Sequence, residues 1–123
     1  MAERERLICA ATDLVEGGDG VRFELARRDM SGRPVPAFVV RYRGTPRAFV
    51  NRCAHVPVEL DWTAGQFFDS QGLYLLCATH GATYMADTGL CVMGPCKGRR
   101  LEPLPVVERD GQVFLIEEVP PAA

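Results

Sequence analysis

The sequence predicts a small all-β domain built from antiparallel strands. Short runs rich in Val, Phe, Leu and Ile are separated by turns that contain glycine or proline, which is typical of strands joined by tight connections. No segment shows sustained helical periodicity with capping residues, and 12 glycines and 9 prolines are spread along the chain, where they interrupt long helices. With 123 residues, 47% of them hydrophobic, the chain is large enough for one domain with its own core.

The expected strands follow from local patterns along the chain. Residues 21–26 alternate Val, Phe and Leu with Arg, Glu and Ala, and residues 37–42 contain Phe-Val-Val, which favours strands. The turn signal Arg43-Gly44-Thr45-Pro46 predicts that residues 48–50 return as the second strand of a hairpin. Later strands are expected at residues 73–76, at residues 83–85 before the turn Asp87-Thr88-Gly89, and at residues 113–116 after the turn Asp110-Gly111.

Outside these strands the sequence gives weaker indications of secondary structure. Residues 61–68 are expected to hold a short helical turn. The Glu/Arg-rich start and the Pro-Pro-Ala-Ala end are expected to be frayed tails.

The charge balance and hydropathy exclude two classes of partner. The formal net charge is −2, so the chain lacks the concentrated basic face that binds a phosphate backbone, and we expect no nucleic acid partner. No run approaches the roughly 18 apolar residues of a membrane-spanning helix, and the first apolar stretch is too short for the core of a signal peptide. We therefore expect a cytoplasmic protein with no membrane partner.

The cysteines and histidines predict a metal centre. Five cysteines without an export signal argue against a disulfide framework, because cytosolic thiols are kept reduced. The chain has only 2 histidines, and each follows a cysteine closely, in Cys53-Ala54-His55 and Cys77-Ala78-Thr79-His80. Two such loops can bring two thiolates and two imidazoles to one point, as ligands for zinc or an iron–sulfur cluster. Structural zinc sites usually pair cysteine with cysteine and histidine with histidine, which is not the order here.

This pattern resembles the signature of the Rieske [2Fe–2S] family, which is C-x-H, a spacer (here residues 56–76) and C-x₂-H. The resemblance extends over residues 38–116 and includes His80-Gly81-Ala82-Thr83-Tyr84, then Gly94-Pro95, then the Leu-Pro-Pro-Val positions of residues 101–106. It implies one [2Fe–2S] cluster per chain, held by Cys53, His55, Cys77 and His80, because in this family both cysteines bind one iron and both histidines the other.

The resemblance also implies an architecture. A single domain over residues 1–123 would consist of a small antiparallel β-sandwich base, about 7–50 and 98–118, and an inserted cluster-binding subdomain, about 51–97. Gly94-Pro95 would form a loop that shields the cluster, although an ordinary surface turn would have the same sequence.

High-potential members of the family carry two further cysteines and a serine that this chain lacks. Val58 and Thr79 stand at the cysteine positions and Ala82 at the serine position, whereas the tyrosine that accompanies the serine corresponds to Tyr84. Each lost hydrogen bond leaves charge uncompensated on the reduced cluster, so we expect a low potential of about −150 to 0 mV. Tyr84 has a second interpretation, as an aromatic that only packs against the subdomain.

Three cysteines fall outside the ligand set. Cys9 stands alone in an apolar stretch and is interpreted as a small core residue. Cys91 and Cys96 flank Gly94-Pro95, and three interpretations stay open for them: buried thiols, a disulfide formed on oxidation, or ligands of a second metal. A tetrathiolate site made by Cys53, Cys77, Cys91 and Cys96 is a rival to the Rieske ligand set.

The resemblance implies an electron carrier and not an enzyme. A catalytic Rieske oxygenase needs a second iron bound by two more histidines and a carboxylate, and this chain has no spare histidine. It also lacks the Gly-x-Gly-x-x-Gly turn of a flavin or nicotinamide domain. The expected partners are redox proteins, a reductase as donor and an oxygenase or reductase as acceptor. The alternative function is a zinc- or other metal-stabilised structural or interaction module.

Overall fold

The structure is a computed structural model that describes residues 2–54, 58–61, 63–79 and 81–119. Within these ranges the protein is all-β apart from one short 3₁₀ turn, which confirms the predicted fold class. The elements are β1 (Ala2–Ala10), η1 (Ala11–Asp13), β2 (Val21–Arg28), β3 (Pro34–Tyr42), β4 (Thr45–Val50), β5 (Tyr74–Leu76), β6 (Thr83–Met85), β7 (Cys91–Met93), β8 (Pro103–Leu104), β9 (Val106–Arg109) and β10 (Gln112–Val119).

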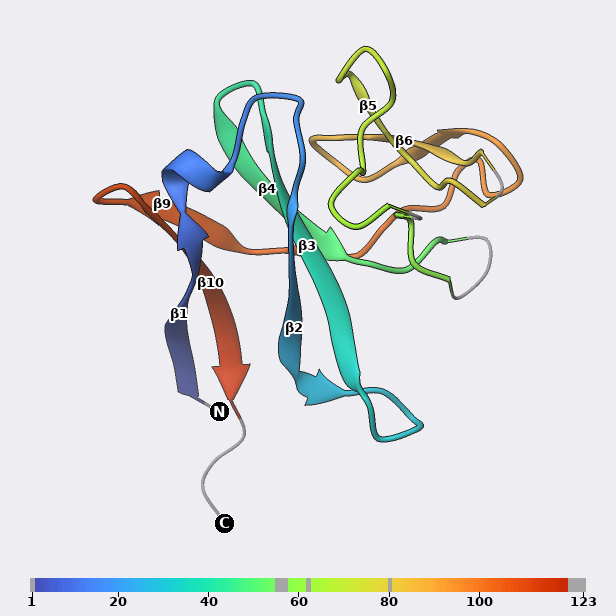
Figure 1. Ribbon diagram of the computed structural model, residues 1–123. Coiled ribbons are helices and arrows are strands. Elements are labelled where there is room, and N and C mark those ends of the chain that lie inside the picture. Colours follow the sequence, from blue (N-terminus) through green and yellow to red (C-terminus); the bar gives the residue numbers. More distant parts are fainter. Residues whose placement is uncertain (1, 55–57, 62, 80, 120–123) are drawn as a thin grey trace.

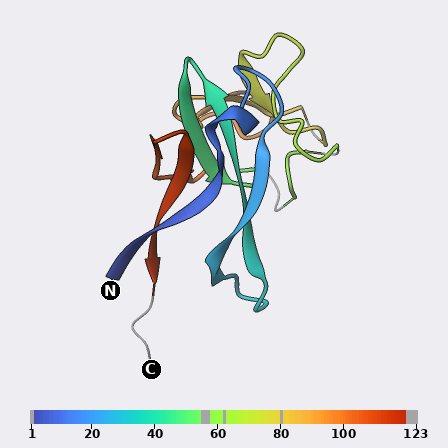
Figure 2. The same ribbon diagram turned by 60° about the vertical axis from the view of Figure 1, so that its left-hand side comes forward.

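Two antiparallel sheets form the larger part of the molecule. One has the strand order β1-β10-β9 and the other β2-β3-β4-β8. Figures 1 and 2 show β1 and β10 side by side in one layer, with β2, β3 and β4 in the second. The first and last strands of the chain therefore pair with each other in the first layer.

Strand β3 is buried on both faces and separates two hydrophobic cores. Val35, Ala37 and Val39 point toward the β1-β10-β9 sheet, where they join residues such as Leu115 and Val113. The alternate side chains belong to the other core, which contains Phe38, Val40, Tyr42, Phe49, Phe67 and Tyr84. Because successive side chains of a strand point to opposite faces, a strand between two cores has few polar positions, and Arg41 is the only charged residue of β3.

Two predicted hairpin turns are confirmed in detail. Arg43 and Gly44 both have positive φ, 52° and 75°, in the two-residue turn between β3 and β4. Asp110 and Gly111 repeat this conformation, 54° and 74°, between β9 and β10. Two consecutive positive φ angles match the right-handed twist of the strands that the turn joins. Glu16 stabilises the first turn, because its carboxylate accepts the backbone N–H groups of Arg43 and Gly44 at 2.7 and 2.6 Å.

The expectation of a frayed start is wrong. Residues Ala2–Ala10 form β1, which pairs antiparallel with β10. Its charged side chains find partners across the sheet, since Arg6 lies 3.2 Å from Glu117 and Glu5 forms an ion pair with Arg109. A charged edge strand also discourages pairing with other chains. The Pro-Pro-Ala-Ala end, residues 120–123, lies outside the described residues.

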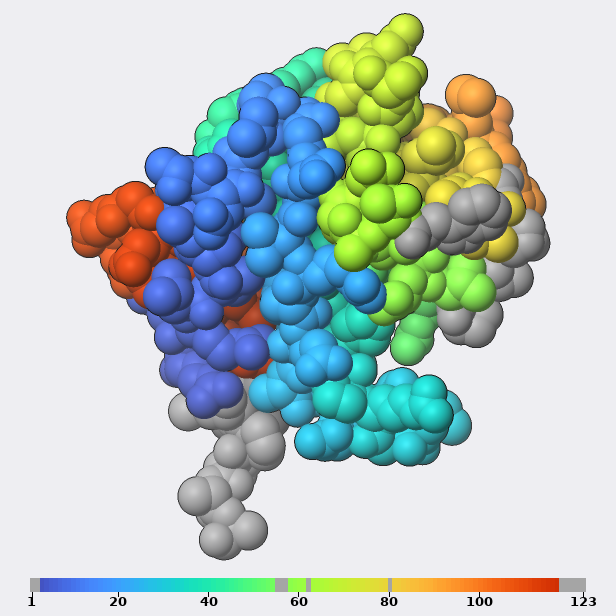
Figure 3. Space-filling model, in the orientation of Figure 1, coloured from blue at the N-terminus to red at the C-terminus, as the bar shows by residue number. Residues whose placement is uncertain are grey.

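A third, smaller sheet of order β5-β6-β7 sits beside the second layer. Together with the loops of residues 51–54, 58–61 and 94–101 it forms the right-hand side of the molecule in Figures 1 and 3. The described residues of 61–68 form bends and turns instead of the expected helical turn. Within the described part of the chain, no helix has the length and hydrophobicity needed to cross a membrane.

Candidate metal centre

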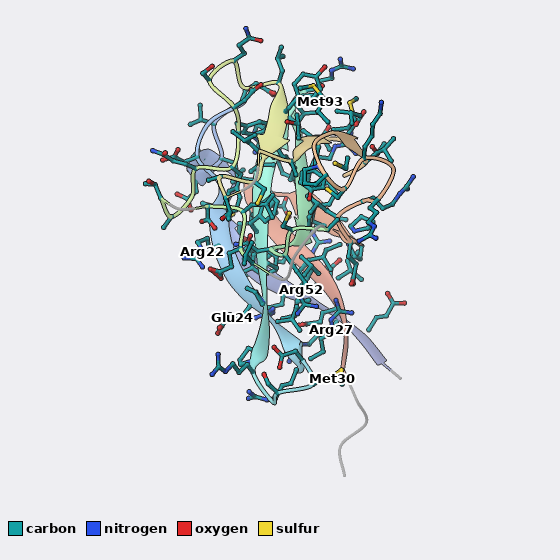
Figure 4. The ribbon with its side chains drawn as sticks, turned by 90° about the vertical axis from the view of Figure 1, so that its right-hand side faces the viewer. Arg22, Glu24, Arg27, Met30, Arg52 and Met93 are labelled. Atoms are coloured by element: carbon teal, nitrogen blue, oxygen red, sulfur yellow. The ribbon has the colours of Figure 1, made fainter. Side chains whose placement is uncertain are left out.

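Each predicted cysteine ligand lies within three residues of the end of a strand. Cys53 follows β4 and Cys77 follows β5, and their exposed fractions are 3% and 0%. Both belong to the same hydrophobic core as Phe38 and Tyr84. Figure 4 faces the end of the molecule that carries these loops, with Arg52 and Met93 labelled on it. The predicted ligands His55 and His80 lie outside the described residues, so the structure describes two of the four.

The two cysteines begin loops that close in the same way. The backbone N–H of Cys53 donates to the carbonyl of Val58 at 2.8 Å, and the N–H of Cys77 donates to the carbonyl of Ala82 at 2.9 Å. In both loops the partner is the fifth residue after the cysteine. Both loops are therefore short, closed turns with a buried sulfur at the same position.

A backbone hydrogen bond connects the two loop regions. The N–H of Ala78, directly after Cys77, donates to the carbonyl of Leu60 at 3.0 Å. Leu60 is completely buried and follows the first loop by two residues. The structure thus brings together the two loops that the spacing of cysteine and histidine in the sequence singled out.

Tyr84 on β6 is buried, and its hydroxyl reaches the first loop. The hydroxyl oxygen lies 3.2 Å from Sγ of Cys53 and accepts the backbone N–H of Ala54 at 2.9 Å. It also lies 3.3 Å from Sγ of Cys96. Tyr84 therefore both packs in the core and contacts the sulfur of a candidate ligand, so the two interpretations of this residue hold together.

The buried position of the Tyr84 hydroxyl favours its neutral, protonated form. Burial raises the pKa of Tyr84 far above its usual range, and the hydrogen bonds to Cys53 and Cys96 raise it further. Since the N–H of Ala54 occupies one lone pair, the O–H proton remains available to a sulfur atom. A thiolate at Cys53 would be the stronger acceptor, because hydrogen bonds to charged groups are stronger.

A buried polar network supports the first loop, and the sequence analysis did not identify it. The side-chain oxygen of Asn51 accepts the N–H of Leu60 at 2.9 Å, and its amide nitrogen donates to Asp61 at 3.1 Å. Asp61 also accepts the N–H of Gly65 at 3.0 Å and lies 3.5 Å from the guanidinium of Arg22. An Asn and an Asp on either side of a Cys/His loop were the available sequence signal.

The loop that contains Gly94-Pro95 packs against the second cysteine loop. Gly94 has φ +102°, and a Cβ atom there would lie 2.8 Å from Cα of Ala82. Only glycine allows this close approach with that backbone angle. The structure thus shows a close approach between Gly94 and the backbone of Ala82, whereas shielding of the cluster by this loop stays a prediction.

The remaining cysteines do not join Cys53 and Cys77 in a common site. Cys9 is half-buried and packs between the two larger sheets, as expected for a small core residue. Cys91 and Cys96 are buried with their sulfur atoms 2.9 Å apart. Among the described residues, no three Cys, His, Asp or Glu side chains are close enough to hold a metal ion. All four thiols of the rival tetrathiolate site are described, so the structure does not support that alternative.

The described residues fit an iron–sulfur cluster. They present two buried sulfur donors from two joined loops, a hydroxyl group beside one of them, and a backbone hydrogen bond that closes each loop. Cysteine thiolates are the donors that hold such clusters, and an apolar surrounding limits access of water to them.

Comparison with known proteins identifies the class. The family model of the Rieske [2Fe-2S] domain matches residues 5–117, so the chain belongs to this family and its cofactor is a [2Fe–2S] cluster. No curated protein sequence matches the chain.

Solved structures of this fold include ferredoxins and oxygenases. The ferredoxin of Sphingomonas yanoikuyae B1 superposes with a TM-score of 0.70 and 20% identity, over 94% of this chain and 100% of that chain. The ferredoxin of carbazole 1,9a-dioxygenase from Nocardioides aromaticivorans IC177 gives 0.69 and 21%, over 93% and 98%. The terminal oxygenase of the same system gives 0.73 and 23%, over 98% of this chain and 32% of the oxygenase.

Proposed function

We propose that this chain is a Rieske-type ferredoxin, a carrier of single electrons, whose cluster is bound by Cys53, His55, Cys77 and His80. The observation that carries the proposal is the pair of buried sulfur atoms at matched positions in two joined loops. Each loop also contains a histidine, two residues after Cys53 and three residues after Cys77. This gives one sulfur and one nitrogen ligand from each loop, which is the Rieske donor set.

The described residues have separate tasks in this function. When bound, the cluster supplies a centre that accepts and returns one electron. Cys53 and Cys77 hold it from the protein side, where burial excludes water. The hydroxyl of Tyr84 donates to Cys53 and stabilises added negative charge. The network of Asn51 and Asp61 fixes the backbone of the first loop, so that the ligands keep their positions.

The proposal makes the chain an electron-transfer component and not an oxygenase. Both histidines of the sequence are assigned to the cluster, which leaves none for the mononuclear iron of a catalytic subunit. We also propose a low potential, because Val58, Thr79 and Ala82 stand where high-potential members carry the disulfide cysteines and the serine.

The partners in this proposal are a reductase that donates electrons and an oxygenase or reductase that accepts them. A ferredoxin of the same fold, with 24% identity and a TM-score of 0.69, is known in a complex with the oxygenase of carbazole 1,9a-dioxygenase. Redox encounters of this kind are small and weak. The segments 51–60, 77–82 and 91–100 contain the cations Arg52, Lys97, Arg99 and Arg100, and only the carboxylate of Glu59. We therefore propose that the partner surface is acidic.

The domain boundaries and the location complete the proposal. The separate sheet of β5, β6 and β7 supports a cluster-binding subdomain at about 51–97 within a single domain over residues 1–123. We place the carrier in the cytoplasm, where thiols such as those of Cys91 and Cys96 are kept reduced. Cell fractionation with a detection tag tests the location.

Anaerobic purification and spectroscopy test the function. We expect a red-brown protein with a dithionite-induced EPR signal, two irons and two acid-labile sulfides per chain, and a one-electron potentiometric titration. Cys77→Ser should abolish the cluster, whereas Cys9→Ser should retain it. A colourless, EPR-silent protein after reconstitution with iron and sulfide would overturn the proposal, and bound zinc would favour the structural module.

A further inference from the structure

A second pair of sulfur atoms lies beside the candidate metal centre and has no role in the ligand set. Cys91 on β7 and Cys96 in the loop after Gly94-Pro95 have exposed fractions of 1% and 2%. Their Sγ atoms are 2.9 Å apart. Non-bonded carbon atoms, which are smaller than sulfur, already pack at about 3.5–4.0 Å. The two thiols are therefore closer than ordinary core packing places them, although they are not bonded.

The backbone holds the two cysteines together. The N–H of Cys91 donates to the carbonyl of Arg99 at 2.7 Å, and the N–H of Gly98 donates to the carbonyl of Cys91 at 3.1 Å. The N–H of Arg99 donates to the carbonyl of Cys96 at 2.9 Å. The main chain of Arg99 thus forms a hydrogen bond with each of the two cysteines. Because this loop is already closed, a covalent bond between the sulfur atoms requires only a small movement of the chain.

We propose that Cys91 and Cys96 are a redox-active pair that forms a reversible intrachain disulfide. In the forward step two S–H bonds break and one S–S bond forms, and a small disulfide such as glutathione disulfide is reduced to two thiols. The two protons of the cysteines pass to those product thiols, so that atoms and electrons balance. A second metal is the weaker interpretation, since among the described residues no third ligand joins the pair.

The pair is in contact with the candidate ligand Cys53 through one side chain. The hydroxyl of Tyr84 lies 3.3 Å from Sγ of Cys96 and 3.2 Å from Sγ of Cys53. The S–H of Cys96 donates to Sγ of Cys91, so a disulfide removes this proton and changes the sulfur atom that lies next to the Tyr84 hydroxyl. The oxidation state of the pair therefore changes the environment of the hydroxyl that faces Cys53. This consequence for the cluster rests on the proposed function, whereas formation of the disulfide does not.

The reaction is expected to be slow. Burial, together with the hydrogen bond and charge of Cys96, raises the pKa of Cys91 to about 11, so little thiolate is present at neutral pH. The covering residues Met93, Gly94 and Pro95 are exposed, so that a local opening of this loop gives a reagent access. We expect oxidation over minutes to hours, on the timescale of uncatalysed thiol–disulfide exchange.

Mass spectrometry tests the disulfide directly. Purified holoprotein is equilibrated with mixtures of reduced and oxidised glutathione, then denatured and alkylated. Cleavage before aspartate produces the fragment of residues 87–109, which contains Cys91 and Cys96 and no other cysteine. The proposal expects this fragment with no alkyl group after oxidation and two after reduction. Two alkyl groups under every condition, or a linkage to Cys53 or Cys77, would overturn it.

Two comparisons test the consequences of the bond. The oxidised protein should melt about 5 °C above the reduced protein, because the bond constrains the unfolded chain, and Cys91→Ser should remove this difference. A lower melting temperature would contradict the claim that the backbone accommodates the bond. Cys9→Ser is the matched control, since Cys9 lies between the other two sheets.

The effect on the cluster has its own measurement. The reduction potential of the holoprotein should differ between the two states of the pair, and this difference should disappear in Tyr84→Phe. A potential that does not respond to oxidation of the pair overturns the connection through Tyr84. The mass measurement does not depend on the cluster, so a chain that forms the disulfide but shows no EPR signal would refute the proposed function alone.

Discussion

The hydroxyl oxygen of Tyr84 lies 3.2 Å from Sγ of Cys53, and Tyr84 pairs with Cys91 across the β6–β7 sheet. One strand residue thus stands between a candidate cluster ligand and the neighbouring thiol pair. The Ala54 N–H at 2.9 Å fixes the hydroxyl in this position.

Replacement of Tyr84 by Phe should lower the reduction potential by about 20–60 mV. This range corresponds to the loss of one hydrogen bond of about 0.5–1.5 kcal/mol to a sulfur that carries more negative charge after reduction. Protein-film voltammetry measures the shift. Tyr74→Phe, at an exposed position of β5, is the control and should leave the potential unchanged. An unchanged potential in Tyr84→Phe would show that the hydroxyl does not interact with a ligand sulfur.

The potential of the unmodified protein should lie at about −150 to 0 mV, the lower part of the range for Rieske centres. The reason is that Ala82 is a buried residue without a hydroxyl group, and that Val58 carries no thiol. A potentiometric titration followed by EPR gives the value. A midpoint above about +100 mV would mean that other groups supply the missing hydrogen bonds.

Asn51→Ala should destabilise the protein by about 1–3 kcal/mol, because it leaves the buried N–H of Leu60 without its partner and removes the hydrogen bond to Oδ1 of Asp61. The first cysteine loop begins two residues later, so cluster content should fall as well. Urea unfolding and iron analysis measure the two effects. Gln71→Ala, at an exposed loop position, should change neither. Full stability in Asn51→Ala would mean that water replaces the amide.

The ion pair between Glu5 and Arg109 should make stability depend on pH. The hydrogen bond and the charge of Arg109 lower the pKa of Glu5 below its usual range. A lowered pKa in the folded state contributes stability above the unfolded pKa, and this contribution is lost as the pH falls through the folded pKa. Glu5→Gln should therefore melt below the wild type at pH 7 and approach it under acidic conditions. Glu3→Gln, on the same strand, is the control for loss of a carboxylate from β1. If the melting temperatures of Glu5→Gln and the wild type differ by the same amount at all pH values, the ion pair is not the cause of the pH dependence.

Rates of electron transfer to charged small-molecule acceptors should show whether electrons leave through the basic surface around the loops. Salt should slow electron transfer from the reduced protein to anionic ferricyanide, and it should not slow transfer to cationic hexaamminecobalt(III). The double variant Lys97→Glu/Arg100→Glu should slow the reaction with ferricyanide by about 3–10-fold. Arg33→Glu, in the turn between β2 and β3, is the control (Figure 1). Equal rates before and after charge reversal would place electron exit elsewhere.

Much of the fold was accessible from the sequence because its signals are local. The apolar run of β3 and the turns at Arg43-Gly44 and Asp110-Gly111 depend on neighbouring residues, and they were predicted correctly. Strand β1 was not, since its charged residues form a strand only through pairing with β10 at the other end of the chain. A hydrophobic pattern cannot report such a partner.

In the candidate site, too, the features that depend on local motifs were predicted and those that depend on distant contacts were not. The positions of Cys53 and Cys77 after strands follow from short motifs, and the structure joins their loops. The contact of Cys91 with Cys96 could not be predicted, because a spacing of five positions fits several loop conformations. It depends on the path of the chain at Gly94, which in turn depends on the contact with Ala82. The network of Asn51 and Asp61 was missed because it depends partly on main-chain N–H groups, those of Leu60 and Gly65, which no pattern of side chains indicates.

Strand β3 contributes side chains to two cores, one on each face. The packing of both cores therefore depends more on the number of residues in β3 than on any one of its side chains. A single inserted or deleted residue within it would exchange the two faces, so that Phe38 and Val40 would face the β1-β10-β9 sheet and Val39 the cysteine loops. Both cores would then lose their packing in one event. Natural variation in this protein is therefore expected to accumulate as substitutions in β3, while insertions and deletions are confined to the connecting turns.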